Sequence, residues 1–281
     1  MNIEFKQIQT NGIQLHTVLA GPSDGKPVFL LHGFPEAWFG WEKQLEPLSS
    51  AGFRVIVPDQ RGYNLSDKPT GVDQYQMKVL VDDILGLADS LGYERFYLAG
   101  HDFGAMVSWG LALRAPERVI SLVIANVPHP AVFKSYLRSH PAQMLKSWYA
   151  VFFQLPGIPE RFVKAGNWKF LIRAMPKYWS ESEYNRYRKA WNQPGAITAM
   201  VNWYRATFGS SGTKRESNLI GPETLIIWGK RDPHLSHQMA ELSLEYCTSG
   251  KLVFFEDATH WVQHDKAEEV SQLLIDHFSK G

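Results

Sequence analysis

Six short, almost wholly apolar runs constrain the fold of this chain more than any other feature. They occupy residues 28–31, 53–57, 96–99, 119–125, 224–228 and 252–255. Such runs are typical of parallel strands that are covered on both faces. Several of them are separated by stretches with helical periodicity, at residues 77–91, 103–114, 236–247 and 266–278. This alternation predicts an α/β fold with a mostly parallel sheet flanked by helices.

The N-terminal segment has a different pattern. Residues 3–10 and 12–20 alternate apolar and polar side chains around the turn signal Asn11-Gly12. Strict alternation indicates strands with one solvated face, and an Asn-Gly pair favours a tight hairpin turn. We therefore expect an antiparallel hairpin at one edge of the sheet.

The strand pattern stops between residues 130 and 215. Phe, Trp and Tyr supply about a fifth of this stretch and about a tenth of the remaining chain. The aromatic side chains could form the core of an inserted helical subdomain, line an apolar pocket beneath a lid, or do both. We expect a core domain of residues 1–129 and 216–281, with a helical cap of residues 130–215.

The composition restricts the partners and the compartment. The chain has 281 residues, of which 44% are hydrophobic and 20% charged, with a net charge of +1. This balance favours neither a nucleic acid nor a membrane as partner. The chain has one cysteine, Cys247, an N-terminal segment without an apolar signal core, and no apolar run near 18 residues. We therefore expect a soluble cytoplasmic protein.

The string Gly100-His101-Asp102-Phe103-Gly104 connects an apolar run to a helical pattern. Glycines on both sides allow the sharp strand-to-helix turn called a nucleophile elbow, here with Asp102 where serine is usual. Asp102 could instead be a simple N-cap of the helix that begins at Phe103. The elbow interpretation makes Asp102 a candidate nucleophile.

An aspartate nucleophile narrows the reaction class. Its carboxylate is ionised at neutral pH without the help of a base, and it suits displacement at an sp³ carbon. The resulting ester keeps its carbonyl on the enzyme, so that water can restore the carboxylate, whereas a serine would be left as an ether. Epoxides and alkyl halides are therefore better candidate substrates than esters and amides.

Two candidate partners follow the nucleophile in the order acid, histidine, which is usual after such an elbow. Asp232 follows the apolar run 224–228, and His260 follows the run 252–255. Both positions lie at strand C-terminal ends, where α/β sheets hold their sites. The other interpretation of Asp232 is a turn residue before Pro233. We interpret His32 and His101, which neighbour the site, as hydrogen-bonded structural groups. The histidines near predicted helices are interpreted as surface or packing residues, namely His234, His237, His264 and His277.

The string Leu31-His32-Gly33-Phe34-Pro35 ends an early strand. By itself it could be an ordinary turn. Beside an elbow, however, the backbone N–H groups of Phe34 and Phe103 are candidates for an oxyanion hole that stabilises the charge formed when water adds to the ester.

Together, four strings resemble the α/β-hydrolase-fold epoxide hydrolases of the soluble, bacterial type. They are residues 32–36 (His-Gly-Phe-Pro-Glu), 59–63 (Asp-Gln-Arg-Gly-Tyr), 100–104 (Gly-His-Asp-Phe-Gly) and 257–261 (Asp-Ala-Thr-His-Trp). The resemblance covers nearly the whole chain and includes the cap strings at 148–157 and 202–205.

The resemblance implies a specific reaction. An epoxide becomes a vicinal diol through a hydroxyalkyl ester on Asp102, which His260-activated water hydrolyses without a cofactor or a metal. It also implies that Tyr149 and Tyr204 hydrogen-bond the epoxide oxygen, and that the bond before Pro35 is cis. The aromatic cap favours apolar or aryl epoxides. One departure is Phe103, where many relatives carry tryptophan.

Several rival functions share parts of this pattern. Haloalkane dehalogenases use the same aspartate, but they usually bind halide through tryptophan and asparagine where this chain has Phe103 and Phe34. Fluoroacetate dehalogenases have arginines at the positions of Phe103 and Met106. A serine esterase needs a serine in the elbow string, where this chain has Asp102. A protein that only binds a ligand does not need a complete set of catalytic residues.

Overall fold

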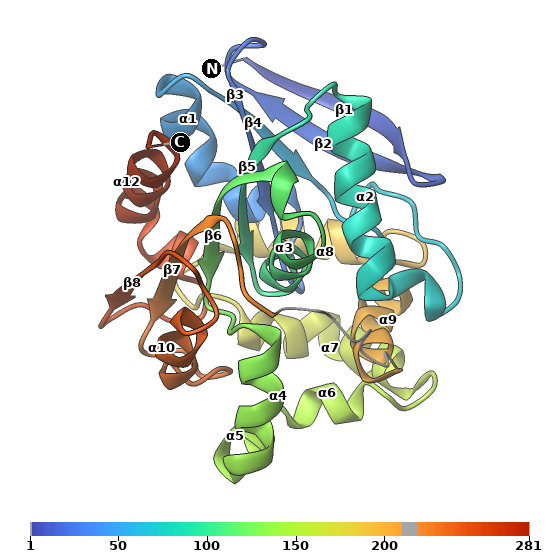
Figure 1. Ribbon diagram of the computed structural model, residues 1–281. Helices are drawn as coiled ribbons and strands as arrows, with labels where there is room; N and C mark the ends of the chain where they lie inside the picture. The colour runs from blue at the N-terminus through green and yellow to red at the C-terminus, as the bar shows by residue number, and fades with distance from the viewer. Residues whose placement is uncertain (1, 210–217, 281) are drawn as a thin grey trace.

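The computed structural model describes residues 2–209 and 218–280, and it contains a twisted sheet at its centre (Figure 1). The strands of this eight-stranded sheet follow the order β1-β2-β4-β3-β5-β6-β7-β8. Their bounds are β1 Ile3–Thr10, β2 Ile13–Ala20, β3 Lys26–Leu31, β4 Phe53–Pro58, β5 Phe96–His101, β6 Val119–Ala125, β7 Glu223–Gly229 and β8 Gly250–Phe255. From β4 to β8 all neighbours are parallel, whereas β2 is antiparallel to both β1 and β4.

The apolar runs form strands because both faces of the sheet are covered. Every residue of β4 and β5 is buried. The predicted hairpin is also present: β1 lies at the sheet edge and is half-exposed, and Asn11 and Gly12 take positive φ angles of 42° and 78° in its turn. The α/β fold predicted from the sequence is thus confirmed.

Helices cover both faces of the sheet. Helices α1 and α12 pack against each other on one face, and α2 and α3 pack together on the other (Figure 1). The core helices and 3₁₀ turns are η1 Trp38–Trp41, α1 Glu42–Ser50, η2 Asp73–Tyr75, α2 Met77–Ser90, α3 Phe103–Arg114, η3 Pro116–Arg118, α10 Gln238–Leu244, α11 Val262–Asp265 and α12 Ala267–Phe278. Helix α10 is shorter than the predicted 236–247. The backbone N–H groups of Tyr246 and Cys247 donate hydrogen bonds to the carbonyl oxygens three residues earlier, and so form a tighter turn.

Between β6 and β7 the described chain is helical, as predicted for the cap. Its helices are α4 Pro130–Ser139, α5 Pro141–Lys146, α6 Trp148–Phe152, α7 Ile158–Ala174, α8 Glu181–Trp191 and α9 Ala196–Gly209. The predicted start of the cap coincides with the first residue of α4. The predicted end, at residues 215 and 216, lies outside the described residues, so the exact division remains a prediction.

The cap aromatics have two kinds of neighbour. Trp168 and Trp191 pack on each other, with ring centres 5.6 Å apart, inside the cap. Tyr204, in contrast, contacts the core domain at Phe34 and Phe103, with centre distances of 5.1 Å and 4.7 Å. The cap therefore has its own core and also covers the end of the sheet at which the elbow lies. Among the described residues, no helix is both long and apolar enough to cross a membrane.

Candidate active site

Asp102 lies at a strained turn between β5 and α3. Its φ and ψ angles are 50° and −123°, which non-glycine residues rarely adopt. Glycines make room for this turn: a Cβ at Gly33 would lie 2.3 Å from the Cβ of Asp102, and a Cβ at Gly104 would lie 2.1 Å from the carbonyl oxygen of Leu31. The side chain makes no capping hydrogen bond to α3. The geometry therefore fits an elbow better than a simple helix cap.

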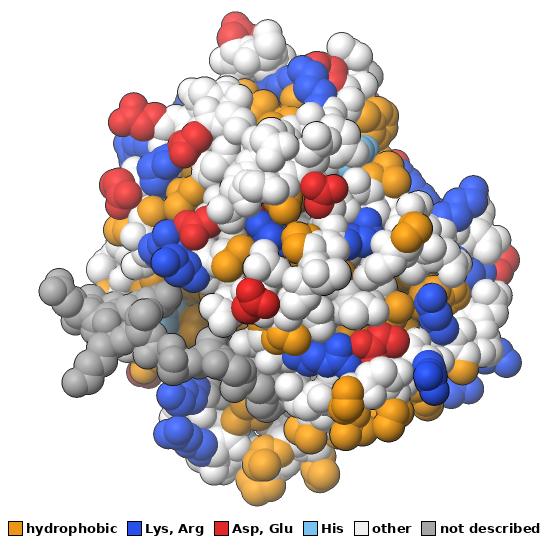
Figure 2. All heavy atoms as spheres, turned by 90° about the vertical axis from the view of Figure 1, so that its right-hand side faces the viewer, with side chains coloured by type: hydrophobic (Ala, Val, Ile, Leu, Met, Phe, Trp, Pro, Cys, Tyr) orange, Lys and Arg blue, Asp and Glu red, His pale blue; other side chains and the backbone are white. Residues whose placement is uncertain are grey.

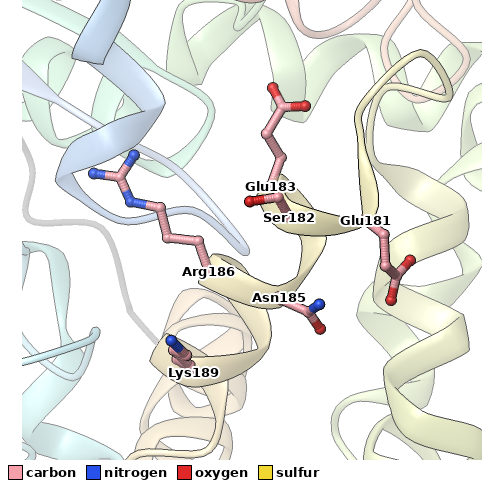
Figure 3. Close-up of a pocket in the computed structure, with 6 residues that line it drawn as sticks. All are labelled: Glu181, Ser182, Glu183, Asn185, Arg186 and Lys189. Carbon is pink, nitrogen blue, oxygen red and sulfur yellow. The ribbon is translucent and has the colours of Figure 1, made fainter.

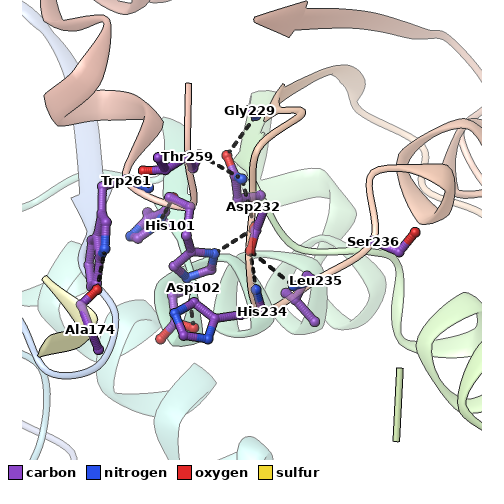
Figure 4. A network of polar contacts seen from close by, with 12 residues as sticks. His101, Asp102, Ala174, Gly229, Asp232, His234, Leu235, Ser236, Thr259 and Trp261 are labelled. Atoms are coloured by element: carbon purple, nitrogen blue, oxygen red, sulfur yellow. Dashed lines mark hydrogen bonds and ion pairs between the residues drawn. The ribbon is translucent and has the colours of Figure 1, made fainter. Parts of the chain in front are cut away.

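His260 connects Asp102 to Asp232 (Figure 4). Its Nδ1–H donates to Oδ2 of Asp232 at 2.7 Å, and its Nε2 lies 3.5 Å from Oδ2 of Asp102. His260 and Asp232 are buried, at 3% and 5% exposure. The sheet thus brings together three residues that are up to 158 positions apart in sequence, because β5, β7 and β8 all end at the same edge.

Asp232 is held rigidly as a carboxylate. Its Oδ1 accepts hydrogen bonds from the backbone N–H groups of His234 and Leu235, at 2.7 Å and 2.9 Å. Its Oδ2 also accepts from Nδ2 of Asn126 at 2.9 Å. With His260, these donors satisfy both carboxylate oxygens, so the acid keeps a fixed orientation for the imidazole. A solvated turn residue would not need so many buried partners.

The two carboxylates control the protonation of His260. Burial lowers the pKa of His260, but the charge of Asp232 and the hydrogen bonds to Asp102 and Asp232 outweigh burial and raise the pKa to about 10. Burial likewise opposes ionisation of Asp102, yet the hydrogen bond and charge of His260 keep its pKa below the usual value. Near neutral pH the resting site therefore contains an imidazolium between two carboxylates.

One candidate oxyanion donor contacts the carboxylate oxygen of Asp102 that does not face His260. The N–H of Phe34 donates to Oδ1 of Asp102 at 2.7 Å. Phe103 is the first residue of α3, so its N–H has no acceptor within that helix. The peptide bond between Phe34 and Pro35 is cis, as the family resemblance implies.

The two cap tyrosines lie close to each other and to the nucleophile. Tyr149 on α6 and Tyr204 on α9 have ring centres 5.9 Å apart. Burial, followed by the charge of Asp102, raises the pKa of Tyr149, and burial raises that of Tyr204 well above its usual value. Within the described chain neither phenol has a hydrogen-bond partner. Both are protonated donors that remain available to a ligand.

The sequence interpretation missed His234. We expected a surface or packing residue, and the packing alternative is correct. The ring of His234, which Figure 4 labels, packs edge-on against His260 and Tyr149 at centre distances of 5.2 Å and 5.9 Å, which places it at the site. Burial, followed by the charge of His260, lowers the pKa of His234 to about 4, so the ring is neutral. The sequence signal that could have identified His234 is its position two residues after Asp232. The loop that carries Asp232 has to lie close to the candidate base, His260.

A second missed group surrounds Glu36, which is fully buried behind the site. Its Oε1 accepts from Nε2 of His264 at 2.6 Å and from the hydroxyl of Tyr187 at 3.0 Å, and its Oε2 accepts from Nε2 of Gln263 at 3.0 Å. The charge and hydrogen bond of His264, together with the neighbouring His101, outweigh burial and hold the pKa of Glu36 far below its usual value. His264 is therefore not a surface residue.

The hydrogen bonds around Glu36 extend to the loop that carries His260. Gln263 also donates to Nδ1 of His101 at 3.1 Å, and Nε2–H of His101 donates to the carbonyl oxygen of His260 at 2.8 Å. His101 is thus a hydrogen-bonded structural group, as predicted from its place beside Asp102. The network fixes the backbone of both His260 and the elbow.

Among the described residues, no group of three or more His, Cys, Asp or Glu side chains is arranged so that it could hold a metal ion. A hollow of about 550 Å³ lies beside α8, lined by charged side chains such as Glu181, Arg186 and Lys189 (Figure 3). None of its lining residues belongs to the Asp102 site.

The fold and this constellation define an α/β hydrolase with an aspartate at the elbow. The alpha/beta hydrolase fold family model matches residues 26–267. The AB hydrolase superfamily protein YfhM of Bacillus subtilis is 44% identical over 280 residues, which cover 98% of each chain. Human epoxide hydrolase 4 is 36% identical over 96% of this chain and 77% of its own length.

The structural comparison gives the same result. A crystal structure of an epoxide hydrolase from Bacillus megaterium in complex with an inhibitor superimposes with a TM-score of 0.88, at 29% identity, over 98% of this chain and all of that chain. The chain belongs to the epoxide hydrolases of the α/β-hydrolase fold family.

Proposed function

We propose that this chain hydrolyses small-molecule epoxides to vicinal diols through a covalent ester on Asp102. The observation that carries the proposal is the pair of unpaired, protonated phenols, Tyr149 and Tyr204, next to an ionised nucleophile. An opening epoxide develops negative charge on its oxygen, and two fixed donors match that charge. The family relationship supports the same reaction.

In the first step, Oδ2 of Asp102 attacks a ring carbon while Tyr149 and Tyr204 donate hydrogen bonds to the ring oxygen. The carbon–oxygen bond of the ring breaks, and the alkoxide takes a proton from a phenol, which solvent later reprotonates. Oδ1 is the better candidate for the carbonyl oxygen of the ester, because Phe34 already donates to it.

In the second step, water adds to the ester carbonyl and His260 takes the proton. Ester formation removes the negative charge of Asp102, which is one cause of the high pKa of His260. The pKa of the imidazole consequently falls, so that His260 first releases its proton to solvent, which balances the proton that solvent gave to the phenolate, and can then act as a base. The N–H groups of Phe34 and Phe103 stabilise the oxyanion. Its collapse releases the alkoxide, which takes the proton from His260 and leaves as the diol. Asp102 is left as a carboxylic acid, and its proton passes to His260, which restores the resting ion pair.

The ring environment supports apolar or aryl epoxides as the preferred substrates. Phe34, Phe103 and Phe153 all pack edge-on against Tyr204, at centre distances between 4.7 Å and 5.1 Å. Aromatic faces and edges give an aryl group favourable contacts close to the reacting carbon.

An aryl epoxide and a bromoalkane distinguish this function from haloalkane dehalogenation. We expect diol from the epoxide and no bromide from the bromoalkane, because Phe34 and Phe103 offer the departing halide no side-chain donors. Product is measured by chromatography and bromide by ion-selective detection. Bromide release without diol formation would mean that the proposal is wrong.

Replacing Tyr149 or Tyr204 with phenylalanine should slow ester formation by about 100-fold, because each change removes one donor to the developing alkoxide. The rate of ester hydrolysis should stay near the wild-type value, since the phenols act before that step. Rapid-quench single-turnover kinetics separate the two rates. Tyr178→Phe, a tyrosine on the exposed side of the cap, is the matched control. Equal losses in both steps would indicate a merely structural role.

A further inference from the structure

The outer side of the cap exposes large apolar side chains that the proposed reaction does not use. The described residues include thirteen exposed large hydrophobic side chains, and seven of them lie between residues 144 and 162. We call these seven the cap apolar face: Met144, Leu145, Trp148, Val151, Leu155, Ile158 and Phe162. Leu145 and Val151 are 77% and 64% exposed. Scattered exposed leucines are normal, but such a concentration marks an interaction surface.

The cap apolar face spans neighbouring elements. Phe152 of α6 contacts both Trp148 and Phe162, at centre distances of 6.1 Å and 5.2 Å, and so joins α6 to α7. Helix α5, which carries Leu145, packs against α6. These helices lie at the lower end of the molecule, farthest from the β1–β2 hairpin (Figure 1). Hydrophobic side chains gather along the same lower edge, with lysine and arginine side chains nearby (Figure 2).

The chain segment that carries this face has charge of mostly one sign. Residues 130–178 contain eight lysines and arginines and one acidic residue, Glu160, which is paired with Arg205 at 2.7 Å. All eight cations are exposed, and none forms an ion pair with a described carboxylate. They are Lys134, Arg138, Lys146, Arg161, Lys164, Lys169, Arg173 and Lys177. The net charge of +1 for the whole chain hides this local excess, and our sequence-based expectation of no membrane partner relied on that average.

We propose that the cap apolar face docks on the surface of a lipid bilayer that contains anionic lipids. Exposed leucine, isoleucine and tryptophan side chains next to unpaired lysines and arginines are typical of surfaces that lie in the headgroup region. Anionic lipid headgroups supply negative charge for the eight cations, which have no carboxylate partner among the described residues. Each lysine or arginine near such a surface strengthens binding by about fivefold.

A second copy of the chain is a poorer occupant of this face. A two-fold dimer places the same patch on both sides of the interface. The exposed cations next to the face in sequence, such as Lys146 and Arg161, would then lie near the same cations of the second copy, which is unfavourable. Electrostatics therefore favours an anionic surface over self-association.

Vesicle sedimentation tests this proposal with the intact chain. We expect binding to phosphatidylcholine vesicles that contain 30% phosphatidylserine, weak binding to pure phosphatidylcholine, and release at high salt. The variant Lys164→Glu/Lys169→Glu should weaken binding to anionic vesicles by about 25-fold or more, at about fivefold for each cation lost. Lys78→Glu/Lys280→Glu, which makes the same charge change on the core domain, is the matched control and should bind like the wild type.

The apolar contribution is tested separately with Leu145→Ser/Ile158→Ser. We expect weaker vesicle binding but unchanged turnover of a water-soluble epoxide, because neither side chain belongs to the proposed catalytic machinery. Leu242→Ser, at an exposed leucine on α10, is the control. Equal binding of the wild type and both cap variants would overturn the proposal. So would a dimer in sedimentation equilibrium that Leu145→Ser/Ile158→Ser disperses while no vesicle binding occurs.

Discussion

Replacing His260 with glutamine should make the enzyme accumulate as a covalent ester on Asp102. The first step needs only the ionised carboxylate and the phenol donors, all of which remain. The second step loses the base that activates water, which typically costs between 10² and 10⁴ in rate. Intact-protein mass spectrometry after incubation with an aryl epoxide should therefore show an added mass equal to that of the substrate, while steady-state diol formation nearly stops.

A matched substitution separates the loss of a base from the loss of any histidine. His237→Gln makes the same chemical change at a ring that packs on Phe254 and does not contact His260 or Asp102. This variant should turn over normally and carry no adduct. If His260→Gln continued to form diol without adduct, water would have to attack the epoxide directly, and the covalent route would be wrong.

The sheet could be predicted from the sequence because each strand has a sequence pattern of its own within a few residues. A strand buried on both faces must be apolar along its whole length, so β3 to β7 were visible as short runs. Strand β8 lies at the sheet edge and is only partly buried, but its residues 252–255 are apolar as well. The hairpin turn was visible for a similar reason, since few residues other than Asn11 and Gly12 tolerate positive φ angles so readily. The cap was recognised by its lack of strand patterns, its many aromatic residues and its family resemblance. Its helix bounds depend on packing that no short stretch of sequence contains.

The site was partly predictable because the α/β fold brings strand ends together. Once Asp102 was placed at an elbow, the strand order left few positions for an acid and a base. Glu36 and His264 were not found, because they are 228 positions apart and only the folded structure shows their 2.6 Å contact. The structure likewise shows that His234 packs on both His260 and Tyr149, whereas in the sequence it follows a turn proline and resembles a surface residue.

The resting charge state explains why a nucleophile and a base can share one small site. Two carboxylates raise the pKa of His260 to about 10, so the imidazolium stabilises Asp102 as an anion before the reaction. Esterification removes one of these charges. The same histidine can then act first as an electrostatic partner and later as a base, without any movement of the backbone.

Replacing Asp102 with alanine should abolish both the adduct and the turnover, by about 10⁴-fold or more, because no other carboxylate reaches the reacting carbon. In the background of His260→Gln it should remove the trapped ester, which identifies the residue that carries it. Asp276→Ala, an exposed aspartate on α12, is the control for the loss of a carboxylate. An adduct that persists in Asp102→Ala/His260→Gln would place the nucleophile elsewhere.

The Asp102→Ala variant also tests the electrostatic coupling independently of activity. The pKa of His260 should fall below about 10, because the hydrogen bond and charge of Asp102 help to raise it, but it should stay above the pKa of a free histidine because Asp232 remains. Nuclear magnetic resonance of ¹⁵N-labelled imidazole, followed across a pH titration, measures both values. An unchanged pKa would mean that Asp102 does not control the protonation of His260, and that the fall proposed on ester formation does not occur.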